Sequence, residues 1–424
     1  MNRSIEVRAA PKPRPTADRH VATPPLALPL IVAAGLMLLS VVMRLPTAFY
    51  TGEPNQIAFN NYIFQFLGAY SDITSLYFRD QLWNHPLPYV DYQVEYPVGM
   101  AVLIWLIGFV NSSAWNYLLA TGLVMIGSGL IIVMLARQFA GANLWLLALS
   151  PTLLLYTVLN WDMVSVMLTV LALLLFRRDR DAWGSFALAA ATWTKFFPIV
   201  LVPLVLLDRV LKRRWRDAFV IGGVFGVASI AINAPFAIEW NGGLRIRSSW
   251  RYFFEFNQQR IREVNLWNFF DGLGLTTAQI NQLSALLLAA GIAAIMALMW
   301  LSARRGPIRS DLLLPASLAA IGWFFFINKV YSPQYSLWLA VLLALLAAPT
   351  ALAITFAAVD VGYFVVSFVL LFLSSSQNPA SSWLFDQVLL PATAVREAII
   401  LLLIGWACWR LVRSDQLIFA NTRE

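Results

Sequence analysis

Acid groups concentrate in one polar stretch of the chain, residues 70–97, which follows the first apolar segment. The stretch combines four carboxylates with one arginine and a run of aromatic side chains, and its charged residues are Asp72, Asp80, Asp91, Glu95 and Arg79. A positioned carboxylate can take a proton from a reacting hydroxyl, which typically contributes on the order of 10²–10⁴-fold to a rate. We therefore interpret this stretch as the floor of a catalytic site at a membrane surface.

The elements that must position this site are apolar helices. The 424 residues are 60% hydrophobic and only 12% charged, whereas soluble domains have about 25% charged residues. A helix crosses the bilayer core with roughly 20 apolar residues, and segments of this kind recur along the whole chain, without the alternating pattern of barrel strands. The sequence therefore predicts an all-α fold, a polytopic transmembrane helical bundle of about 12 spans.

The apolar segments also predict the domain boundaries. We expect a disordered cytoplasmic tail, a transmembrane domain and a second cytoplasmic tail, at residues 1–25, 26–412 and 413–424. Three loops are expected outside the cytoplasm, at residues 44–97, 236–278 and 374–395. The spans are expected at residues 26–43, 99–110 (partial), 114–136, 144–159, 163–176, 183–194, 197–211, 218–235, 279–302, 312–327, 337–348, 352–373 and 398–409. Pro198 lacks an N–H, so residues 183–211 are predicted to form a hairpin with Lys195 at its tip.

The distribution of basic residues predicts the orientation. Of the 30 Lys and Arg residues, 20 fall in the segments predicted to be cytoplasmic, which places both termini of this cell-membrane protein in the cytoplasm. The net charge is +8, but the basic clusters are short and lie between apolar segments, which indicates membrane topology and not a nucleic-acid surface. The only cysteine is Cys408. No His, Cys and Asp cluster has metal-ligand spacing, so no metal site and no cofactor are predicted; a divalent ion held by Asp72 and Asp162 stays open as an alternative.

Several short motifs resemble those of the polyprenol-phosphate-dependent sugar transferases of the GT-C superfamily, and in particular glycosyltransferase family 87. They are Ser71-Asp72-Ile73 with Leu76-Tyr77, Glu95-Tyr96-Pro97, the turn at Asp162, Thr194-Lys195-Phe196-Phe197-Pro198, and Ser332-Pro333-Gln334-Tyr335 with Trp338. Their order and spacing extend over residues 70–338. The chain departs from the family pattern at Val98, where a second proline is common, and at Asn160-Trp161-Asp162, where a Gly-Gln turn is common.

The resemblance implies a transferase that moves a sugar, expected to be mannose, from a polyprenyl-phosphate-linked donor to a glycolipid or glycan acceptor outside the membrane. The lipid-linked donor would be a co-substrate, membrane lipid a partner, and the anomeric centre would be inverted. The family's first-loop acid falls on Asp72, which becomes the candidate catalytic base. The alternative for Asp72 is an N-cap, because Asp before Ile-Thr-Ser is also good capping chemistry.

Arg79 and the remaining acids of the site have two interpretations each. Arg79 either lines the site or forms a solvated pair with Asp80, which would contribute little to stability. Glu95 and Tyr96 lie where the chain re-enters the membrane, so the carboxylate of Glu95 either lines the site or is held by a structural partner. Asp162 either accepts hydrogen bonds from acceptor hydroxyls or pairs with Lys195, because a carboxylate near membrane depth needs a partner.

The cations at the outer helix ends are candidates for binding the phosphate of the donor. Fixed positive charge stabilises the negative charge that grows on a leaving phosphate, and Lys195, Lys329 and Arg260 are the candidates. Gln334 and Tyr335 offer hydrogen bonds to sugar hydroxyls. Three further arginines are expected to contact anionic lipid head groups, namely Arg245, Arg247 and Arg251. Trp338 offers either a stacking face for the sugar or a member of the interfacial aromatic belt.

Two other classes of protein compete with the transferase. A transporter or lipid flippase would place its charged residues along a path across the midplane, whereas those of this chain gather at one predicted face. A non-catalytic envelope-assembly protein of the same fold would have lost its base, whereas this chain has Asp72.

Overall fold

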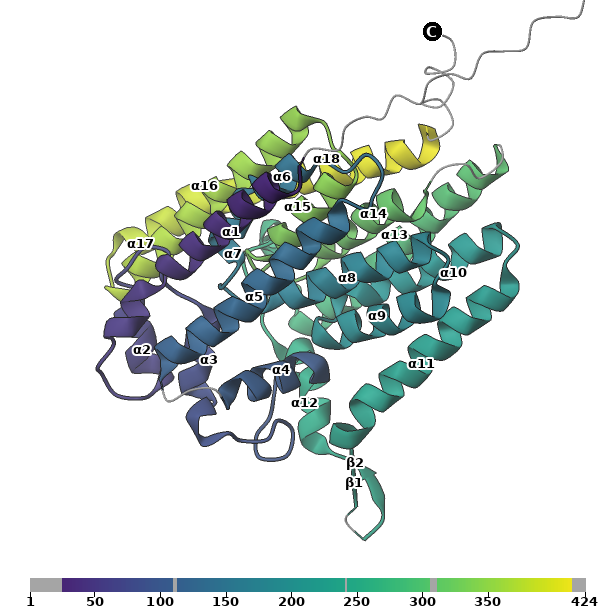
Figure 1. The fold of residues 1–424 in the computed structure, drawn as a ribbon. Helices are drawn as coiled ribbons and strands as arrows, with labels where there is room; N and C mark the ends of the chain where they lie inside the picture. The colour runs from purple at the N-terminus through teal and green to yellow at the C-terminus, as the bar shows by residue number, and fades with distance from the viewer. Residues whose placement is uncertain (1–24, 110–112, 241, 306–310, 414–424) are drawn as a thin grey trace, which may run out of the picture.

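The computed structural model of the protein describes residues 25–109, 113–240, 242–305 and 311–413, and within them almost every element is a helix (Figure 1). Among the described residues, six helices are long and apolar enough to cross a membrane. They are α1 with a following 3₁₀ turn (Ala27–Phe49), α5 (Ala114–Ala136), α11 (Trp215–Ala237), α13 (Thr277–Arg304), α16 (Thr350–Ser375) and α17 to α18 (Ala380–Arg413). The predicted tails, residues 1–25 and 413–424, lie outside the described residues except for Pro25 and Arg413. The helical bundle is thus confirmed, and the chain is a membrane protein by the length and composition of these helices.

The remaining helices are shorter than a bilayer crossing requires, so the predicted total of about 12 spans is not confirmed. Those that fall on predicted spans are α4 (Val98–Gly108), α6 (Leu144–Ala148), α7 (Pro151–Tyr156), α8 (Asp162–Arg177), α9 (Asp181–Thr194), α10 (Val202–Leu211), α14 (Leu313–Ile327) and α15 (Tyr335–Leu345). Residues 144–159 were predicted as one span and form two helices, because Pro151 supplies no N–H to continue α6.

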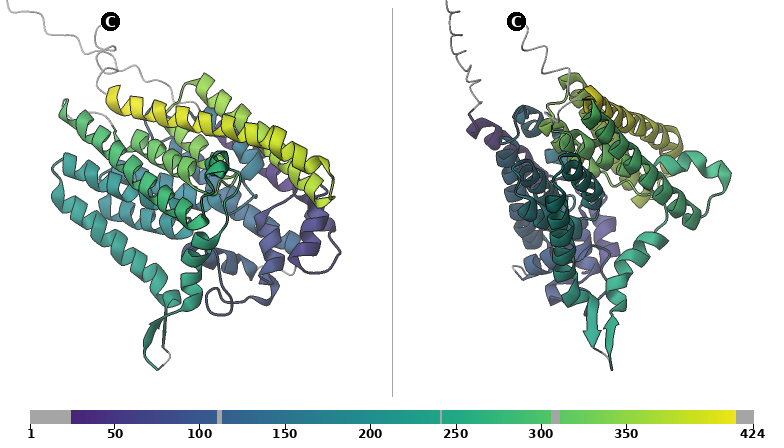
Figure 2. Two further views of the ribbon diagram at one scale, coloured as in Figure 1. Left: turned by 180° about the vertical axis from the view of Figure 1, so that it is seen from behind. Right: turned by 90° about the vertical axis from the view of Figure 1, so that its right-hand side faces the viewer.

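The core of the bundle lies around α14 and α15. Every residue of α15 is buried, and α14 packs against α18 and the 3₁₀ turn Phe197–Leu201. By contrast, α11 and α13 expose large apolar side chains such as Phe219 and Leu286, and they diverge from each other in the side view, with α12 (Ser248–Gln259) running between them (Figure 2). Apolar side chains on an outer helix face are what a lipid-facing helix requires.

Residues 44–97 form short helices and turns at one end of the bundle. After the 3₁₀ turn Leu45–Phe49 come α2 (Gln56–Ile63), α3 (Asp72–Arg79) and a 3₁₀ turn at Leu82–Asn84. The segment predicted as the first loop therefore contains short helices.

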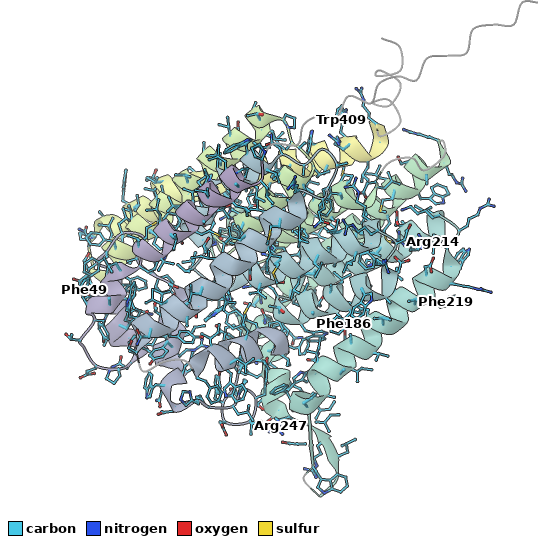
Figure 3. The ribbon with its side chains drawn as sticks, viewed as in Figure 1. Phe49, Phe186, Arg214, Phe219, Arg247 and Trp409 are labelled. Atoms are coloured by element: carbon cyan, nitrogen blue, oxygen red, sulfur yellow. The ribbon has the colours of Figure 1, made fainter. Side chains whose placement is uncertain are left out.

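The second predicted loop, residues 236–278, is also structured. It contains a two-stranded antiparallel hairpin, β1 (Ile238–Trp240) and β2 (Leu244–Ile246), followed by α12 and the 3₁₀ helix Leu266–Leu273. The hairpin projects from the bundle at the end of α11 (Figure 1). Arg247 beside it and Phe49 lie toward one end of the molecule, and Arg214 and Trp409 lie toward the other (Figure 3).

The third predicted loop, residues 374–395, is wrong for most of its length. Helix α16 runs to Ser375, α17 (Ala380–Leu384) begins four residues after it ends, and a π-turn (Phe385–Leu389) leads directly into α18 (Leu390–Arg413). The polar run Ser374–Pro379 suggested a loop, but only its last residues leave the helix. Pro391 is tolerated because it lies in the first turn of α18.

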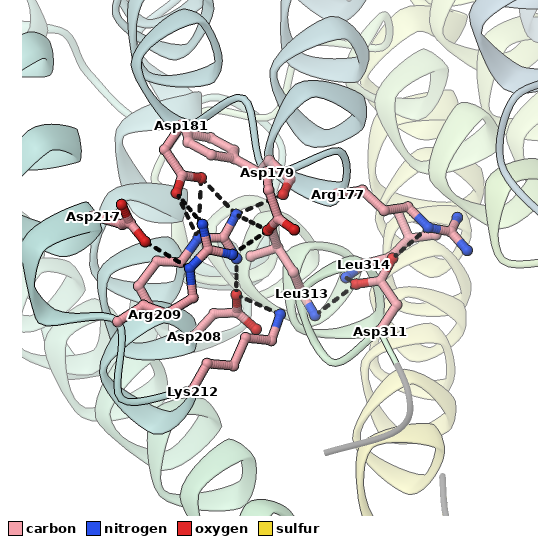
Figure 4. A network of polar contacts seen from close by, with 12 residues as sticks. Arg177, Asp179, Asp181, Asp208, Arg209, Lys212, Asp217, Asp311, Leu313 and Leu314 are labelled. Atoms are coloured by element: carbon pink, nitrogen blue, oxygen red, sulfur yellow. Dashed lines mark hydrogen bonds and ion pairs between the residues drawn. The ribbon is translucent and has the colours of Figure 1, made fainter.

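The predicted hairpin at residues 183–211 is confirmed. Helix α9 ends at Thr194, the chain turns at Lys195, and the 3₁₀ turn Phe197–Leu201 leads into α10. At the base of the hairpin, the buried Arg209 places Nη2 2.6 Å from Oδ1 of Asp181, within the ion cluster of Figure 4. This contact joins α9 to α10 at the end of the hairpin opposite Lys195. The lengths of these two helices therefore determine where Lys195 lies.

Candidate active site

One cavity collects the residues that the sequence singled out. Its volume is about 680 Å³, which is within the range of roughly 300–1,000 Å³ found for small-molecule sites. Nine of the ten candidate site residues line it, namely Asp72, Arg79, Glu95, Tyr96, Lys195, Arg260, Lys329, Gln334 and Tyr335. The acid and the cations, which lie far apart in the sequence, therefore meet in a single cavity.

Asp72 lies in the first turn of α3, and its side chain is not used as a helix cap. The N-cap is Ser71, whose Oγ accepts a hydrogen bond from the backbone N–H of Ile73 at 3.2 Å and donates one to the carbonyl of Val158 at 2.5 Å. The capping alternative for Asp72 is therefore wrong. Helix α3 is fixed against the turn after α7 by a second bond, from the Asp72 N–H to the Leu159 carbonyl at 2.9 Å, which leaves the carboxylate free to face the cavity.

Two neutral donors hold the Asp72 carboxylate. The Tyr70 hydroxyl donates to Oδ1 at 2.8 Å, and the Asn160 amide donates to Oδ2 at 2.7 Å. A carboxylate oxygen can accept two hydrogen bonds, so each oxygen of Asp72 retains a lone pair for a substrate hydroxyl. Tyr70 and Asn160 were not among the site residues predicted from the sequence, although they adjoin two of the motifs that were, the Ser-Asp of α3 and the turn at Asp162.

The environment of Asp72 makes it a stronger base than an ordinary aspartate. Burial raises the pKa of the Asp72 carboxyl, and this outweighs the hydrogen bonds from Asn160 and Tyr70 and the positive charge of Lys195, which act in the opposite direction. A base whose pKa is closer to the working pH transfers protons more effectively. The geometry and the pKa both suit Asp72 to accept a proton.

Lys195 is oriented by a buried carboxylate beneath the cavity. Its Nζ lies 2.9 Å from Oδ2 of Asp162, and Oδ1 of Asp162 accepts a hydrogen bond from the Trp338 indole at 3.0 Å. Asp162 is only 1% exposed and is the one candidate that does not line the cavity. The pairing interpretation of Asp162 therefore holds over direct contact with an acceptor. Trp338 is 1% exposed, so neither the stacking face nor the interfacial belt describes it.

Tyr96 connects the acid side of the cavity to Lys195. Its hydroxyl lies 3.0 Å from the amide nitrogen of Asn160, and the centre of its ring lies 5.2 Å from Nζ of Lys195. An ammonium over an aromatic face is stabilised electrostatically. Tyr96 therefore contacts both Asn160, which holds the Asp72 carboxylate, and Lys195.

Arg79 and Arg260 both have acidic partners. Arg79 pairs with Asp80 at 2.7 Å and with Glu95 at 3.0 Å, so the expected pair is part of a triad, of which Arg79 and Glu95 line the cavity. Arg260 pairs with Glu263, a residue that the sequence analysis passed over. Each of these cations is thus partly neutralised before any ligand binds.

Lys329 differs from the other cations of the cavity. It is 5% exposed, and its Nζ donates to the carbonyl of Gln258 at 3.0 Å. Among the described residues, no carboxylate lies within ion-pair distance of it. Burial lowers the pKa of Lys329, and the positive charge of Arg260 lowers it further. Buried charges are usually paired, so a buried ammonium that faces a cavity without a carboxylate partner is a candidate position for binding an anion.

Part of the cavity wall is apolar. It is built by Phe253 and Phe254 of α12, Phe324 of α14, and Ala285 and Leu288 of α13. Next to them on α13, Leu286 is 68% exposed on the outside of the bundle. A single helix thus separates the cavity from the lipid-facing surface. In the part of the chain that the structure describes, no group of three or more His, Cys, Asp or Glu residues could hold a metal ion.

Together, the helical fold, the membrane-length apolar helices and the cavity indicate a polytopic membrane protein with a candidate ligand site. Residues 94–327 match the family model of glycosyltransferase family 87, and the chain belongs to this family. It is accordingly a membrane glycosyltransferase. The matched region includes Glu95, Asp162, Lys195 and Arg260, whereas Asp72 and Lys329 lie outside it. A comparison with curated proteins found no match.

Proposed function

We propose that this glycosyltransferase moves a sugar, with mannose as the first candidate, from a polyprenyl monophosphate to a hydroxyl of a glycolipid or glycan. One observation carries the proposal. A carboxylate with a raised pKa, Asp72, and a cation without a carboxylate partner among the described residues, Lys329, line one cavity, and part of the wall of that cavity is apolar. A lipid-linked sugar phosphate has the three matching parts, because its sugar is attacked, its phosphate is anionic and its tail is apolar.

The reaction is a single displacement that inverts the anomeric carbon. The acceptor oxygen attacks C1 of the sugar as the C1–O bond to the phosphate breaks, and the bonding electrons leave with the phosphate. The proton of the acceptor hydroxyl passes to Asp72. Lys329 and Arg260 balance the charge that grows on the phosphate, which is the largest effect that a preorganised site usually supplies. Asp162 positions Lys195, and Gln334 and Tyr335 face the sugar hydroxyls.

In this proposal the lipid-linked donor is a co-substrate. Side chains balance the charge on its phosphate, and no resident metal or other cofactor takes part. The apolar wall of α12 and α13 receives the first isoprene units of the donor, so membrane lipid is the medium from which the donor binds. Apolar area gains roughly 25 cal/mol per Å² when it leaves water, so this wall favours a lipid-linked donor over a soluble sugar nucleotide.

The proposal places the cavity on the extracytoplasmic face of the cell membrane and both termini in the cytoplasm. The ion cluster around Arg209 and the last turn of α18, which contains Arg410 and Arg413, lie toward the end opposite the cavity. This agrees with the preference of basic residues for the cytoplasm. In a Cys408→Ala background, a membrane-impermeant maleimide on intact cells should label Gln93→Cys and leave Arg304→Cys unlabelled. The reverse pattern would invert the proposed orientation.

The transfer itself is tested with the full chain in proteoliposomes that contain polyprenyl-phosphate-mannose and a panel of glycan acceptors. Asp72→Asn should lower kcat by at least 10²-fold, because a general base typically contributes on the order of 10²–10⁴-fold. The matched control is Glu53→Gln, an exposed acid of the same segment that lies outside the cavity. Equal transfer by Asp72→Asn and the native protein would remove the proposed base. Donor movement between leaflets without transfer would favour a flippase, and neither transfer nor movement would favour a non-catalytic assembly protein.

A further inference from the structure

A second cavity lies beside the catalytic one and has a different chemistry. Its volume is about 520 Å³, again within the range of roughly 300–1,000 Å³ for ligand sites. It is built by the loop that follows α3, by residues 91–95 and by one face of α12. We propose that this second cavity binds the non-reacting sugars of the acceptor, and that the acceptor is therefore a neutral glycan of more than one sugar. This inference rests on the proposed function.

The lining of the second cavity suits carbohydrate. Among its lining residues only Pro86 and Phe256 lack a polar side-chain group. Amides such as Gln93 combine with the rings of Tyr92 and Tyr252. Sugars present hydroxyls that need both donors and acceptors and apolar faces that pack on aromatic rings, and amides and tyrosines supply each of these.

The charges of the second cavity exclude a phosphate. It contains the carboxylates of Asp80, Asp91 and Glu95, whereas its one cation, Arg79, is already paired with two of them. Like charges within a few ångströms of each other repel. An anionic donor is therefore directed to Lys329 in the first cavity, and the second cavity is left to an uncharged ligand.

The two cavities are adjacent, and the Arg79–Glu95 pair forms part of the wall between them. Arg79, Glu95 and Phe256 line both cavities, and the two charged groups lie 3.0 Å apart. A glycan seated in the second cavity would extend its terminal sugar past this pair toward Asp72. A simple alcohol or a lipid with a single hydroxyl would leave the second cavity empty and lose its contribution to binding.

The polar groups of the second cavity are available for a ligand. Among the described residues, neither the Gln93 amide nor the Tyr92 hydroxyl has a hydrogen-bond partner. The loop that carries them is nevertheless held in place, because Oδ2 of Asp91 accepts from the Leu87 N–H at 2.7 Å and the Tyr89 N–H donates to the Tyr92 carbonyl at 3.0 Å. A preorganised loop with unused donors and acceptors binds with a smaller entropic cost than a loose one.

The inference is tested by binding, which does not depend on transfer. Three fluorescently labelled trisaccharides, of mannose, glucose or galactose, are titrated into the full chain in nanodiscs. We expect at least one of them to bind, and we expect Tyr92→Ala with Gln93→Ala to weaken that binding about tenfold, which corresponds to about 1.4 kcal/mol. Gln65→Ala, an exposed amide of the same segment outside both cavities, is the matched control. Absence of binding by all three trisaccharides, or equal binding by the double variant, would overturn the inference.

Kinetics in proteoliposomes provide a second readout that a merely structural effect would not give. The Tyr92 and Gln93 substitutions should raise the KM for a trisaccharide acceptor about tenfold and leave the KM for the polyprenyl-phosphate donor unchanged. Tyr92→Phe, which keeps the ring, should recover part of the loss. A parallel rise in both KM values would contradict a separate acceptor subsite. If transfer from the polyprenyl donor is absent in the native protein while the trisaccharide still binds, the proposed function fails and the glycan subsite stands.

Discussion

Lys329 is the residue whose replacement tests the phosphate site most directly. It is 5% exposed, and its ammonium donates to a carbonyl and not to a carboxylate. Lys329→Met keeps most of the side-chain length and removes the charge. A hydrogen bond to a charged group contributes about 1.5–3 kcal/mol, and about 1.4 kcal/mol corresponds to a tenfold change. We therefore expect kcat/KM for the polyprenyl-phosphate donor to fall by roughly 10–150-fold.

The same substitution should not weaken the folded protein. The pKa of Lys329 is lowered by burial and by Arg260, so the folded state disfavours the charged form. At a pH below the folded pKa the lysine is charged in both the folded and the unfolded chain, and the whole penalty is present. It is lost as the pH rises from the folded pKa toward the unfolded value of about 10.4. The donor-free Lys329→Met variant should therefore have an equal or higher Tm at neutral pH, and this advantage should shrink at alkaline pH.

The assay measures transfer from radiolabelled polyprenyl-phosphate-mannose in proteoliposomes, together with Tm by differential scanning fluorimetry. Lys212→Met is the matched control, because Lys212 pairs with Asp208 at 2.9 Å at the opposite end of the hairpin. Lys329→Arg keeps the charge and should retain most of the activity. An unchanged kcat/KM for the donor in Lys329→Met would refute the phosphate site. A fall of several degrees in Tm would show that the lysine is structural.

Three further substitutions probe the remaining parts of the site. Asn160→Ala removes a hydrogen bond that lowers the pKa of Asp72, so that pKa should rise further. The base works deprotonated and loses activity as the pH falls through its pKa. The acidic limb of the pH profile of kcat/KM should therefore move to higher pH. An unmoved limb would contradict the role of Asn160. Asp162→Asn leaves Lys195 without its counter-ion and should lower kcat at least tenfold, with an unchanged KM for the acceptor. A change in the acceptor KM alone would instead indicate that Asp162 contacts the acceptor directly. Arg209→Met strands buried carboxylates and should destabilise the fold by about 3–5 kcal/mol, measured as a lowered Tm, whereas an unchanged Tm would show that the ion cluster contributes little.

Much of the site could be predicted from the sequence because its residues share one property, their position at helix ends on the same side of the bundle. Counting apolar segments places Asp72, Lys195 and Lys329 at one face, and the structure brings them into one cavity. The depth of each side chain could not be read in the same way. Asp162 and Lys195 occupy equivalent turns in the sequence, yet only Lys195 lines the cavity, since Asp162 is held beneath it by Trp338.

The fold shows the same division between what a pattern predicts and what tertiary contacts decide. Pro198 correctly predicts the break after α9, because a missing N–H acts locally. The polar run that begins at Ser374 was predicted to start a long loop, but α16 and α17 are interrupted there for only four residues. The polarity of this short run does not reveal that the segment after the interruption, up to Glu397, is helical. The Arg260–Glu263 pair was missed because neither residue belongs to a motif.

The thin wall formed by α13 bears on the route by which the donor reaches the cavity. Leu288 faces the cavity and Leu286 faces outward on the same helix, so a prenyl chain could enter sideways and remain in hydrocarbon throughout. Passage through water would cost about 0.8 kcal/mol for each exposed CH₂. The concentration that matters is then the amount of donor per area of membrane. Turnover should follow the mole fraction of donor among the surrounding lipids. Fusing donor-free lipid vesicles with the proteoliposomes should therefore slow the enzyme even when the total amount of donor is constant.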